Sequence, residues 1–327
     1  SWFTDQGSRA ITATQALEYS SNTYMVQIAI KLLGQQYVPG MALSTDNMDK
    51  AMTTLRDTYA DFGMGVSTGL DLPGESEGYI SKNYNVANVL TEAFGQYDSY
   101  TTIQLAQYVA SIANGGKRVD AHRIRKIIRR SDKKEFETKA QTHELISEQA
   151  AWMMSQLLEK VVSGGYNNYN NILMSNYTVY GKSGTSDWQN EGAQYGIPAG
   201  TAKDEWSLGY TNKYTIACWS GYTTEYIQQG YYITIYDLNV ATAFHISHYM
   251  LDYMQKYATY SAIERPSGIS DYKNGYIKDE FKSKGDTASE STDAQEACVA
   301  DGGEWDEEAG TCKKADDEEK EACVADG

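Results

Sequence analysis

The sequence is poor in proline, histidine and cysteine, with four of each among 327 residues. It contains neither a Cys-x-x-Cys pair nor a His/Cys cluster with zinc-ligand spacing. His245 and His248 have helical spacing, but no third ligand is evident beside them. We therefore expect no metal site and no cofactor. No apolar run reaches the roughly 18 residues that a membrane-spanning helix needs, and no signal peptide opens the chain.

Basic residues are in the minority. The chain has 28 Lys and Arg against 44 Asp and Glu, a net charge of −16, and residues 270–327 alone hold 18 acidic and 7 basic residues. The main basic cluster runs from Arg123 to Lys134, so nucleic-acid binding is not expected. The 41% hydrophobic content is typical of a globular protein, and the length allows one large domain or two ordinary ones.

The spacing of apolar residues predicts helices over residues 11–33, 101–114, 147–163 and 241–257. The first is interrupted by Ser20-Ser21-Asn22, and small polar residues at a helix junction are usually caps. Residues 62–75 contain four glycines and a proline and predict an ordered loop. Residues 119–139 are charged and predict short, exposed strands at best.

A β-prone run from Tyr177 ends in Lys182-Ser183-Gly184-Thr185. Alternate residues of a strand point the same way, so Lys182 and Gly184 share one face while Ser183 and Thr185 share the other. At a strand edge the two hydroxyls could bind a carboxylate, and the glycine would let a ligand approach closely. A free edge there could also pair with a bound peptide. The alternative is a surface loop with a chance tetrapeptide.

Two more β-rich runs, residues 206–210 and 214–222, predict a hairpin with a three-residue loop. From about residue 265 the chain is expected to leave the fold. Residues 261–327 form an acidic tail in which residues 296–302 recur as 321–327, and we expect this tail to be disordered or a string of small stapled loops. Cys298 and Cys312 could close a disulfide loop in an oxidising compartment, which leaves Cys323 without a partner in the tail.

Together, the Ser20-Ser21-Asn22 corner and Lys182-Ser183-Gly184 resemble the Ser-x-Asn and Lys-Thr/Ser-Gly motifs of penicillin-binding proteins, the serine D,D-transpeptidases of bacterial cell-wall synthesis. The resemblance runs from Ile11 to about Tyr257 and implies a domain over residues 1–260. The implied fold class is α/β (α+β), with an antiparallel sheet flanked by helices and an all-helical subdomain that carries the Ser-x-Asn corner. Further segments that resemble the family are residues 11–24, 62–75, 104–116 and 204–211.

One family motif has no counterpart in its usual place. The nucleophile of the family lies in Ser-x-x-Lys, several dozen residues before Ser-x-Asn, but only 19 residues precede Ser20. A formal match at Ser131–Lys134 is downstream, in a charged stretch, and we reject it. The chain also begins without methionine and stops inside its second repeat copy. We therefore expect a piece of a longer protein, inactive alone, with the nucleophile, the N-terminal part of the domain and a membrane anchor outside it.

The resemblance implies acyl transfer through a serine acyl-enzyme, which β-lactams trap. Ser20 would relay a proton toward the leaving group, helped by Lys182, whose charge also favours the substrate's terminal carboxylate. Asn22 would hydrogen-bond the peptide's amide and the lysine of the Ser-x-x-Lys motif. The substrate-binding residues would be Ser183, Gly184 and Thr185.

The implied partners are stem peptides ending in D-Ala-D-Ala, β-lactams and the cell-wall synthesis machinery, at the extracytoplasmic face of the cell membrane. Residues 62–75 look like monofunctional class B enzymes, whereas residues 206–222 and the exit at 265–269 look more like class A, which we favour slightly. The alternatives are a D,D-carboxypeptidase or β-lactamase-type hydrolase of the same fold, and a non-catalytic penicillin-binding module.

Overall fold

The computed structural model describes residues 10–70, 73–166, 168–234, 240–272, 275–282, 304–306 and 311–313, the last two stretches and Asn168 by their backbone alone. The chain divides into two compact units, Ser1–Glu264 and Arg265–Gly327. The domain assignment made from the sequence, residues 1–260 and 261–327, stays a prediction.

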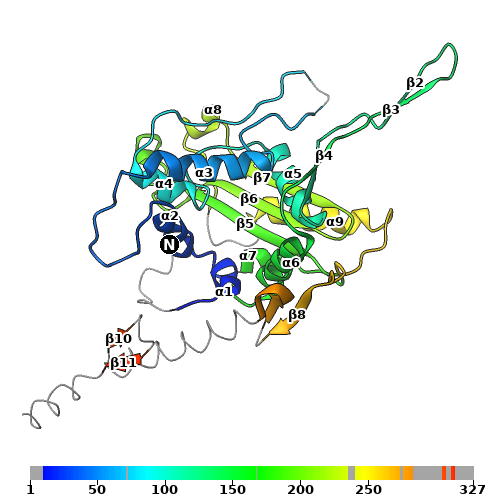
Figure 1. Cartoon of the computed structure of the whole chain (residues 1–327). Helices are drawn as coiled ribbons and strands as arrows, with labels where there is room; N and C mark the ends of the chain where they lie inside the picture. The colour runs from blue at the N-terminus through cyan, green and yellow to red at the C-terminus, as the bar shows by residue number, and fades with distance from the viewer. Residues whose placement is uncertain are drawn as a thin grey trace, which may run out of the picture. The chain divides into compact units, whose positions relative to one another are not determined.

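The described part of the first unit contains helices, two pairs of short strands and a larger sheet (Figure 1). The helices are α1 (Ala13–Glu18), α2 (Asn22–Leu32), α3 (Met48–Asp61), α4 (Val86–Glu92), α5 (Thr102–Ala113), α6 (Glu148–Ser163), α7 (Asn168–Asn171), α8 (Thr224–Ile227) and α9 (Thr242–Met254). The strands are β1 (Lys117–Val119), β2 (Lys126–Ile128), β3 (Glu135–Glu137), β4 (Thr142–Glu144), β5 (Tyr180–Asp187), β6 (Ala202–Tyr210) and β7 (Thr215–Gly221).

Strands β5, β6 and β7 form an antiparallel sheet in that order. The register pairs Lys182 with Leu208 and Leu208 with Ala217, which confirms the predicted strand and the hairpin that follows it. The predicted three-residue hairpin loop is wrong by one residue. It runs over residues 211–214, because β6 ends at Tyr210 and β7 begins only at Thr215. The Thr211 N–H donates to the Tyr214 carbonyl at 2.9 Å and closes the turn.

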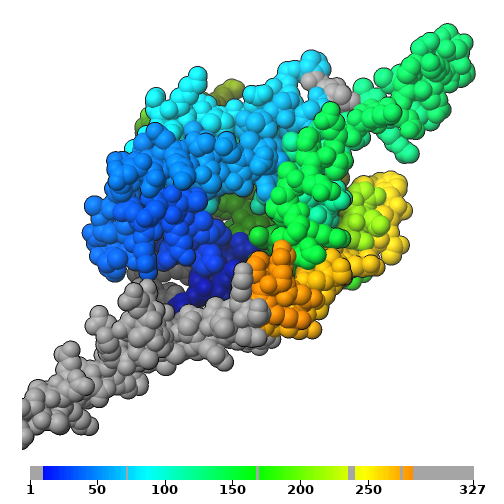
Figure 2. Space-filling model, in the orientation of Figure 1, coloured from blue at the N-terminus to red at the C-terminus, as the bar shows by residue number. Residues whose placement is uncertain are grey.

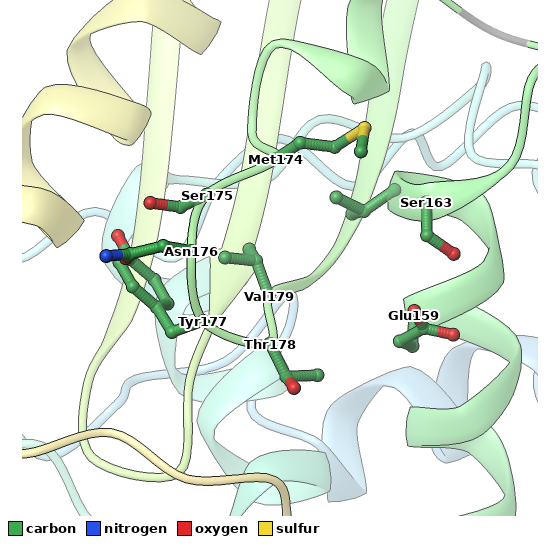
Figure 3. Close-up of a pocket in the computed structure, with 9 residues that line it drawn as sticks. Glu159, Ser163, Met174, Ser175, Asn176, Tyr177, Thr178 and Val179 are labelled. Carbon is green, nitrogen blue, oxygen red and sulfur yellow. The ribbon is translucent and has the colours of Figure 1, made fainter.

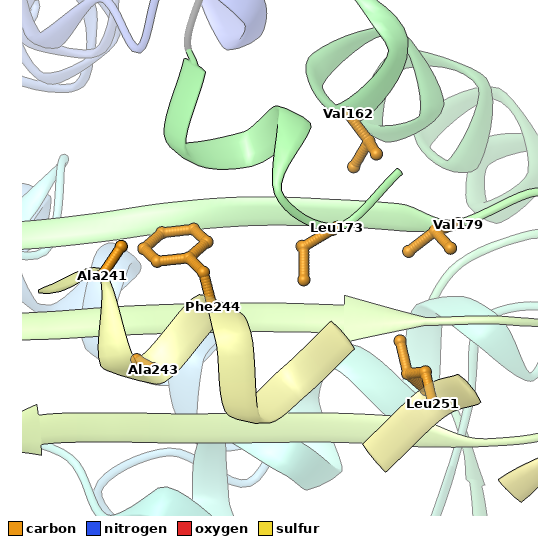
Figure 4. Packing of buried hydrophobic residues seen from close by; sticks show 7 residues of the cluster. All are labelled: Val162, Leu173, Val179, Ala241, Ala243, Phe244 and Leu251. Carbon is orange, nitrogen blue, oxygen red and sulfur yellow. The ribbon is translucent and has the colours of Figure 1, made fainter. Parts of the chain in front are cut away.

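Helices cover both faces of this sheet. On one face, Ile216 and Cys218 of β7 pack against a core that includes Phe244 of α9 (Figure 4). On the other face, Leu208 and Tyr210 of β6 pack against α5 and α6. Burying both faces under helices confirms the expected antiparallel sheet flanked by helices. The buried residues of the α9 cluster are Val162, Leu173, Val179, Ala241, Ala243, Phe244 and Leu251.

A helical part precedes the sheet in the chain. Ala29 of α2, Met52 of α3 and Val89 of α4 are buried together in its core. Helices α3 and α4 were not expected from the sequence, where their few large apolar residues give only a weak helical pattern. Because α2 begins at Asn22, this part confirms the expected all-helical subdomain that carries Ser20 to Asn22. In the described residues, no helix is long and apolar enough to cross a bilayer.

The remaining strands form small sheets of their own. Strand β1 pairs with β4, and β2 with β3. The exposed β2–β3 pair confirms the short strands predicted between residues 119 and 139. In the second unit, β8 (Ile269–Tyr272) pairs with β9 (Gly275–Lys278), and β10 (Glu304–Asp306) pairs with β11 (Thr311–Lys313). Cys298, Cys323 and the side chain of Cys312 lie outside the described residues, so the disulfide stays a prediction.

The core under the Lys182 strand predicts one effect on stability. The Tyr210 hydroxyl donates to Ser155 Oγ at 2.9 Å, and both residues are fully buried. Replacing Tyr210 by Phe is expected to lower the free energy of unfolding by about 1 kcal/mol, because a buried hydrogen bond is lost. Urea denaturation measures this change. The control Tyr249→Phe alters a residue that is 66% exposed, and equal effects of the two substitutions would contradict the prediction.

Candidate active site

Lys182 and Ser20 lie 162 residues apart in the sequence and in direct contact in the structure. The Lys182 Nζ donates to Ser20 Oγ at 2.7 Å and to the carbonyl oxygen of Ser183 at 3.1 Å. The structure therefore brings the helix corner and the lysine-bearing strand to one place. In the space-filling view a hollow opens between the blue helical residues and the green residues of the sheet part (Figure 2).

Ser20 is presented by a strained corner between α1 and α2. Its φ of 52° lies in the left-handed region, which costs a non-glycine residue on the order of 1 kcal/mol or more. The next residue, Ser21, is the N-cap of α2, and its Oγ accepts the Tyr24 N–H at 3.3 Å. The capping interpretation is thus confirmed for Ser21, whereas the side chain of Ser20 contacts the lysine.

Helix α6 sets the distance between the two halves of the site. It packs against both α1 and β5, so the positions of Ser20 and Lys182 both depend on it. Gly164 follows the end of α6, where a side chain would meet the backbone of α6 itself and the flexible end of Glu18 of α1. A Cβ there would lie 2.4 Å from Glu18 Oε1 and 2.5 Å from the carbonyl oxygen of Lys160.

Two glycines flank the lysine along β5. A Cβ on Gly181 would lie 2.8 Å from the carbonyl oxygen of Leu208 and 2.9 Å from Leu173 Cδ1, so only glycine lets the strand pack there. A Cβ on Gly184 would lie 3.3 Å from Trp206 Cβ. We expected Gly184 to leave room for a ligand, and the side chain of Trp206 lies beside that position.

The electrostatics of the site are dominated by desolvation of Lys182. Burial lowers the pKa of the Lys182 ammonium group from 10.5 to about 8, because removal from water disfavours the charged form. Both acceptors of its hydrogen bonds, the Ser20 hydroxyl and the Ser183 carbonyl, are neutral. Protonated and neutral forms of this amine are therefore both accessible near neutral pH.

The other predicted site residues lie around this pair. Asn22 is the first residue of α2 and is half-buried. Ser183 and Thr185 share the face of β5 opposite Lys182, as the strand alternation predicted. Ser183 is half-buried and its Oγ accepts the Asn170 side-chain amide at 3.2 Å, whereas Thr185 is exposed.

Two residues of the site were missed from the sequence. Asn170, which is fully buried, holds the hydroxyl of Ser183. Gln96 donates from Nε2 to the carbonyl oxygen of Thr185 at 2.9 Å across 89 residues. Asn170 lies in a stretch of repeated Asn and Tyr without any pattern of its own, and Gln96 was notable only because it follows the turn glycine Gly95.

A separate pocket of about 310 Å³ lies beside the start of β5 (Figure 3). Its lining comes from the end of α6 and the loop before β5, from Glu159 to Val179. None of the six predicted site residues lines it, so we do not assign it to the candidate site. In the described residues, no group of three or more His, Cys, Asp or Glu is placed to hold a metal ion.

The lowered pKa of Lys182 has a measurable consequence. By NMR we expect the side chain to titrate near pH 8, below the ordinary lysine value of 10.5. Between these two values the unfolded state binds more protons, so the Lys182 contribution to stability rises with pH. The wild type should therefore gain stability relative to Lys182→Met as the pH rises from 8 to 10.5. In other words, the free energy of unfolding of the variant minus that of the wild type should fall over this range. The control Lys160→Met, at a side chain 61% exposed, should show no such trend, and a Lys182 midpoint at 10.5 would contradict the prediction.

Comparison of this chain with known proteins identifies its family. A family model of the penicillin binding protein transpeptidase domain matches residues 1–224. Penicillin-binding protein 2B of Streptococcus pneumoniae is 54% identical over 134 residues, which are 41% of this chain and 20% of that protein. Penicillin-binding protein H of Bacillus subtilis is 41% identical over 142 residues, 43% of this chain and 20% of that protein.

The likeness extends to solved structures. Penicillin-binding protein 2B from Streptococcus pneumoniae strain R6 aligns with a TM-score of 0.64 and 32% identity, covering 79% of this chain and 41% of that one. The chain spans about a fifth of the length of the curated relatives named above. Since the family model covers more than half of the residues, the chain belongs to the penicillin-binding protein transpeptidase domain family.

Proposed function

We propose that this chain forms part of a peptidoglycan D,D-transpeptidase, an acyltransferase that cross-links stem peptides and binds penicillin. The observation that carries the proposal is the 2.7 Å hydrogen bond from Lys182 Nζ to Ser20 Oγ. It joins a proton carrier with a pKa of about 8 to a hydroxyl. That pairing suits proton transfer during acyl exchange, and membership of the family supports the reaction class.

Ser20 is proposed to relay a proton to the leaving group. Because Lys182 donates to Ser20 Oγ, the hydroxyl hydrogen of Ser20 points elsewhere and can be donated to a substrate nitrogen. Lys182 then replaces that proton. A lysine with an ordinary pKa would release its proton much less readily near neutral pH, so the desolvation of Lys182 serves this role directly.

The proposed reaction needs a nucleophilic serine outside residues 1–327. Its hydroxyl gives its proton to a base that is likewise proposed to lie outside these residues, and its oxygen adds to the carbonyl carbon of the penultimate D-Ala. The bond to the terminal D-Ala nitrogen then breaks as that nitrogen takes a proton through Ser20. An amine of a second stem peptide then attacks the ester and loses its proton. The new peptide bond forms, and the serine is released with its hydrogen restored.

Substrate binding is proposed for the residues around the relay. Lys182 supplies positive charge toward the terminal carboxylate, and the exposed hydroxyl of Thr185 can donate to it. Ser183 accepts from Asn170, so its own hydrogen can be donated to the same carboxylate. Gly184 lies between these two hydroxyls, and Asn22 is proposed to hydrogen-bond the peptide's amide and the lysine of the Ser-x-x-Lys motif.

The proposed setting is the extracytoplasmic face of the cell membrane, with the anchor and the contacts to the cell-wall synthesis machinery outside these residues.

The hydrolase alternative predicts a different product from the same acyl-enzyme. Given a stem peptide and an acceptor amine, a transpeptidase yields the cross-linked peptide, whereas a D,D-carboxypeptidase yields the shortened free peptide.

The location of the nucleophile can be tested on the chain itself. Residues 1–327 alone are expected to form no covalent adduct with fluorescent penicillin, because the serine that would be acylated is proposed to lie outside them. Gel fluorescence and intact mass measure the adduct. A chain extended upstream to include a Ser-x-x-Lys segment serves as the positive control. Stoichiometric labelling of residues 1–327 would refute the proposed position of the nucleophile.

The role of Ser20 can be separated from that of its neighbour. In the extended chain, Ser20→Ala is expected to slow acylation by penicillin by roughly 10²- to 10⁴-fold, the usual contribution of general acid–base catalysis. The matched control is Ser21→Ala, which removes the α2 cap. It should lower stability by about 1 kcal/mol and leave the acylation rate near that of the wild type. Similar acylation rates in the two variants would rule out a proton relay through Ser20.

A further inference from the structure

The outer edge of β5 is covered by side chains. In the described sheet β5 has β6 on one side only. Carbonyl groups two residues apart on a strand point to the same edge, and the carbonyls of Ser183 and Thr185 both accept bonds from side chains. The donor to Ser183 is Lys182 Nζ at 3.1 Å, and the donor to Thr185 is Gln96 Nε2 at 2.9 Å.

Gln96 is held by the turn that ends α4. The Gly95 N–H donates to the Glu92 carbonyl at 2.9 Å, and the Gln96 N–H donates to the Thr91 carbonyl at 3.0 Å. With the left-handed φ of 77° at Gly95, these bonds form a Schellman motif. The backbone of Gln96 is therefore fixed, while its side chain is exposed.

Buried carboxylates anchor the same loop. Glu92 is 0% exposed, and its side chain accepts the Asp98 N–H at 3.0 Å and the Tyr100 hydroxyl at 2.8 Å. Asp98 in turn pairs with Arg56 at 2.8 Å. The base of the loop is thus firmly attached, and the contact with Thr185 is an exposed, neutral hydrogen bond at its tip. Such a bond exchanges readily with other partners.

We propose that Gln96 is a specificity-determining residue, whose carboxamide occupies the Thr185 carbonyl in the free protein and must leave it when an acyl-donor peptide binds. This inference rests on the proposed function. In the free protein the side-chain amide of Gln96 occupies the Thr185 carbonyl oxygen. Peptide binding then exchanges this amide donor for the N–H of the peptide.

The reason lies in how a peptide adds to a strand edge. In an antiparallel pair, two opposed residues exchange both N–H···O bonds. If the Thr185 N–H donates to the carbonyl oxygen under attack, the Thr185 carbonyl must accept the N–H of the same substrate residue, the penultimate D-Ala. Gln96 Nε2 is an N–H donor at that position, so it competes with the substrate's amide.

The competition predicts a selective effect. A peptide that presents its penultimate N–H must displace Gln96, and removal of the competitor should tighten its binding. A peptide methylated on that nitrogen has no N–H to donate to the Thr185 carbonyl and does not displace Gln96 from it. Removal of Gln96 should therefore leave the affinity of the methylated peptide unchanged.

Titration of the 327-residue chain by NMR tests this with N-acetyl-L-Lys-D-Ala-D-Ala and the same peptide methylated on the penultimate nitrogen. For Gln96→Ala, and for Gln96→Met, which keeps the length and removes the donor, we expect the Kd of the unmethylated peptide to fall by roughly two- to tenfold. The methylated peptide should show no change. An unchanged or weakened affinity of both variants for the unmethylated peptide would overturn the inference.

A matched control is available at the end of the same strand. Gln189 also donates from its side chain, but to the Asp187 carboxylate and not to a carbonyl of the β5 edge. Gln189→Ala should therefore bind both peptides like the wild type, and a Kd shift equal to that of Gln96→Ala would also refute the competition. Failure of the wild-type chain to bind either peptide would count against the proposed function itself, whereas wild-type binding without a Gln96 effect refutes this inference alone.

Discussion

The rest of the site depends on one desolvated ammonium group, that of Lys182. An ionised lysine removed from water requires oxygen acceptors, and this one donates to two neutral oxygens, those of the Ser20 hydroxyl and the Ser183 carbonyl. A carboxylate in either position would favour the charged form and raise the pKa of the lysine. With neutral acceptors, burial dominates and the pKa is lowered to about 8. Burial, with no charged acceptor among these two partners to offset it, keeps this proton exchangeable near neutral pH.

The contact also requires two separately built parts to stay in place. The Ser20 corner belongs to the helical part with its own buried cluster around Ala29 and Met52, whereas Lys182 belongs to the sheet, which is packed through Leu208 and its neighbours. Helix α6 contacts both sides. A left-handed serine persists only where its surroundings determine it, so the strain at Ser20 is consistent with a corner whose side chain is positioned for a purpose other than capping. Ser21 beside it does the capping.

The local chemistry of the site could be predicted from the sequence, but its long-range contacts could not. Strand alternation placed Lys182 and Ser183 on opposite faces because the side-chain period of a strand is fixed. No local pattern specifies that Asn170 would reach Ser183 or that Gln96 would reach Thr185, since these contacts arise from how α7 and the α4 turn pack around β5. Helix α3 was missed for a related reason. Its buried face is made of small or flexible residues such as Ala51 and Met52, so burial depends on α2 and α4 rather than on a strong apolar stripe.

An open strand edge creates a conflict between protection and use. Among the described strands β5 has a neighbour on one side only, and the N–H and C=O groups of such an edge invite pairing with any extended chain. A site that binds an extended peptide nevertheless needs that edge to be available. Covering it with another strand would solve the first problem and abolish the second. Single side chains avoid the conflict, because Lys182 and Gln96 each satisfy one carbonyl and can be displaced one at a time. Their different attachments give them different roles: Lys182 is rooted in the strand itself and also contacts Ser20, whereas Gln96 reaches across from a loop and makes an exposed contact. Of the two, Gln96 is therefore the donor that the proposed peptide can replace without breaking the hydrogen bond between Lys182 and Ser20.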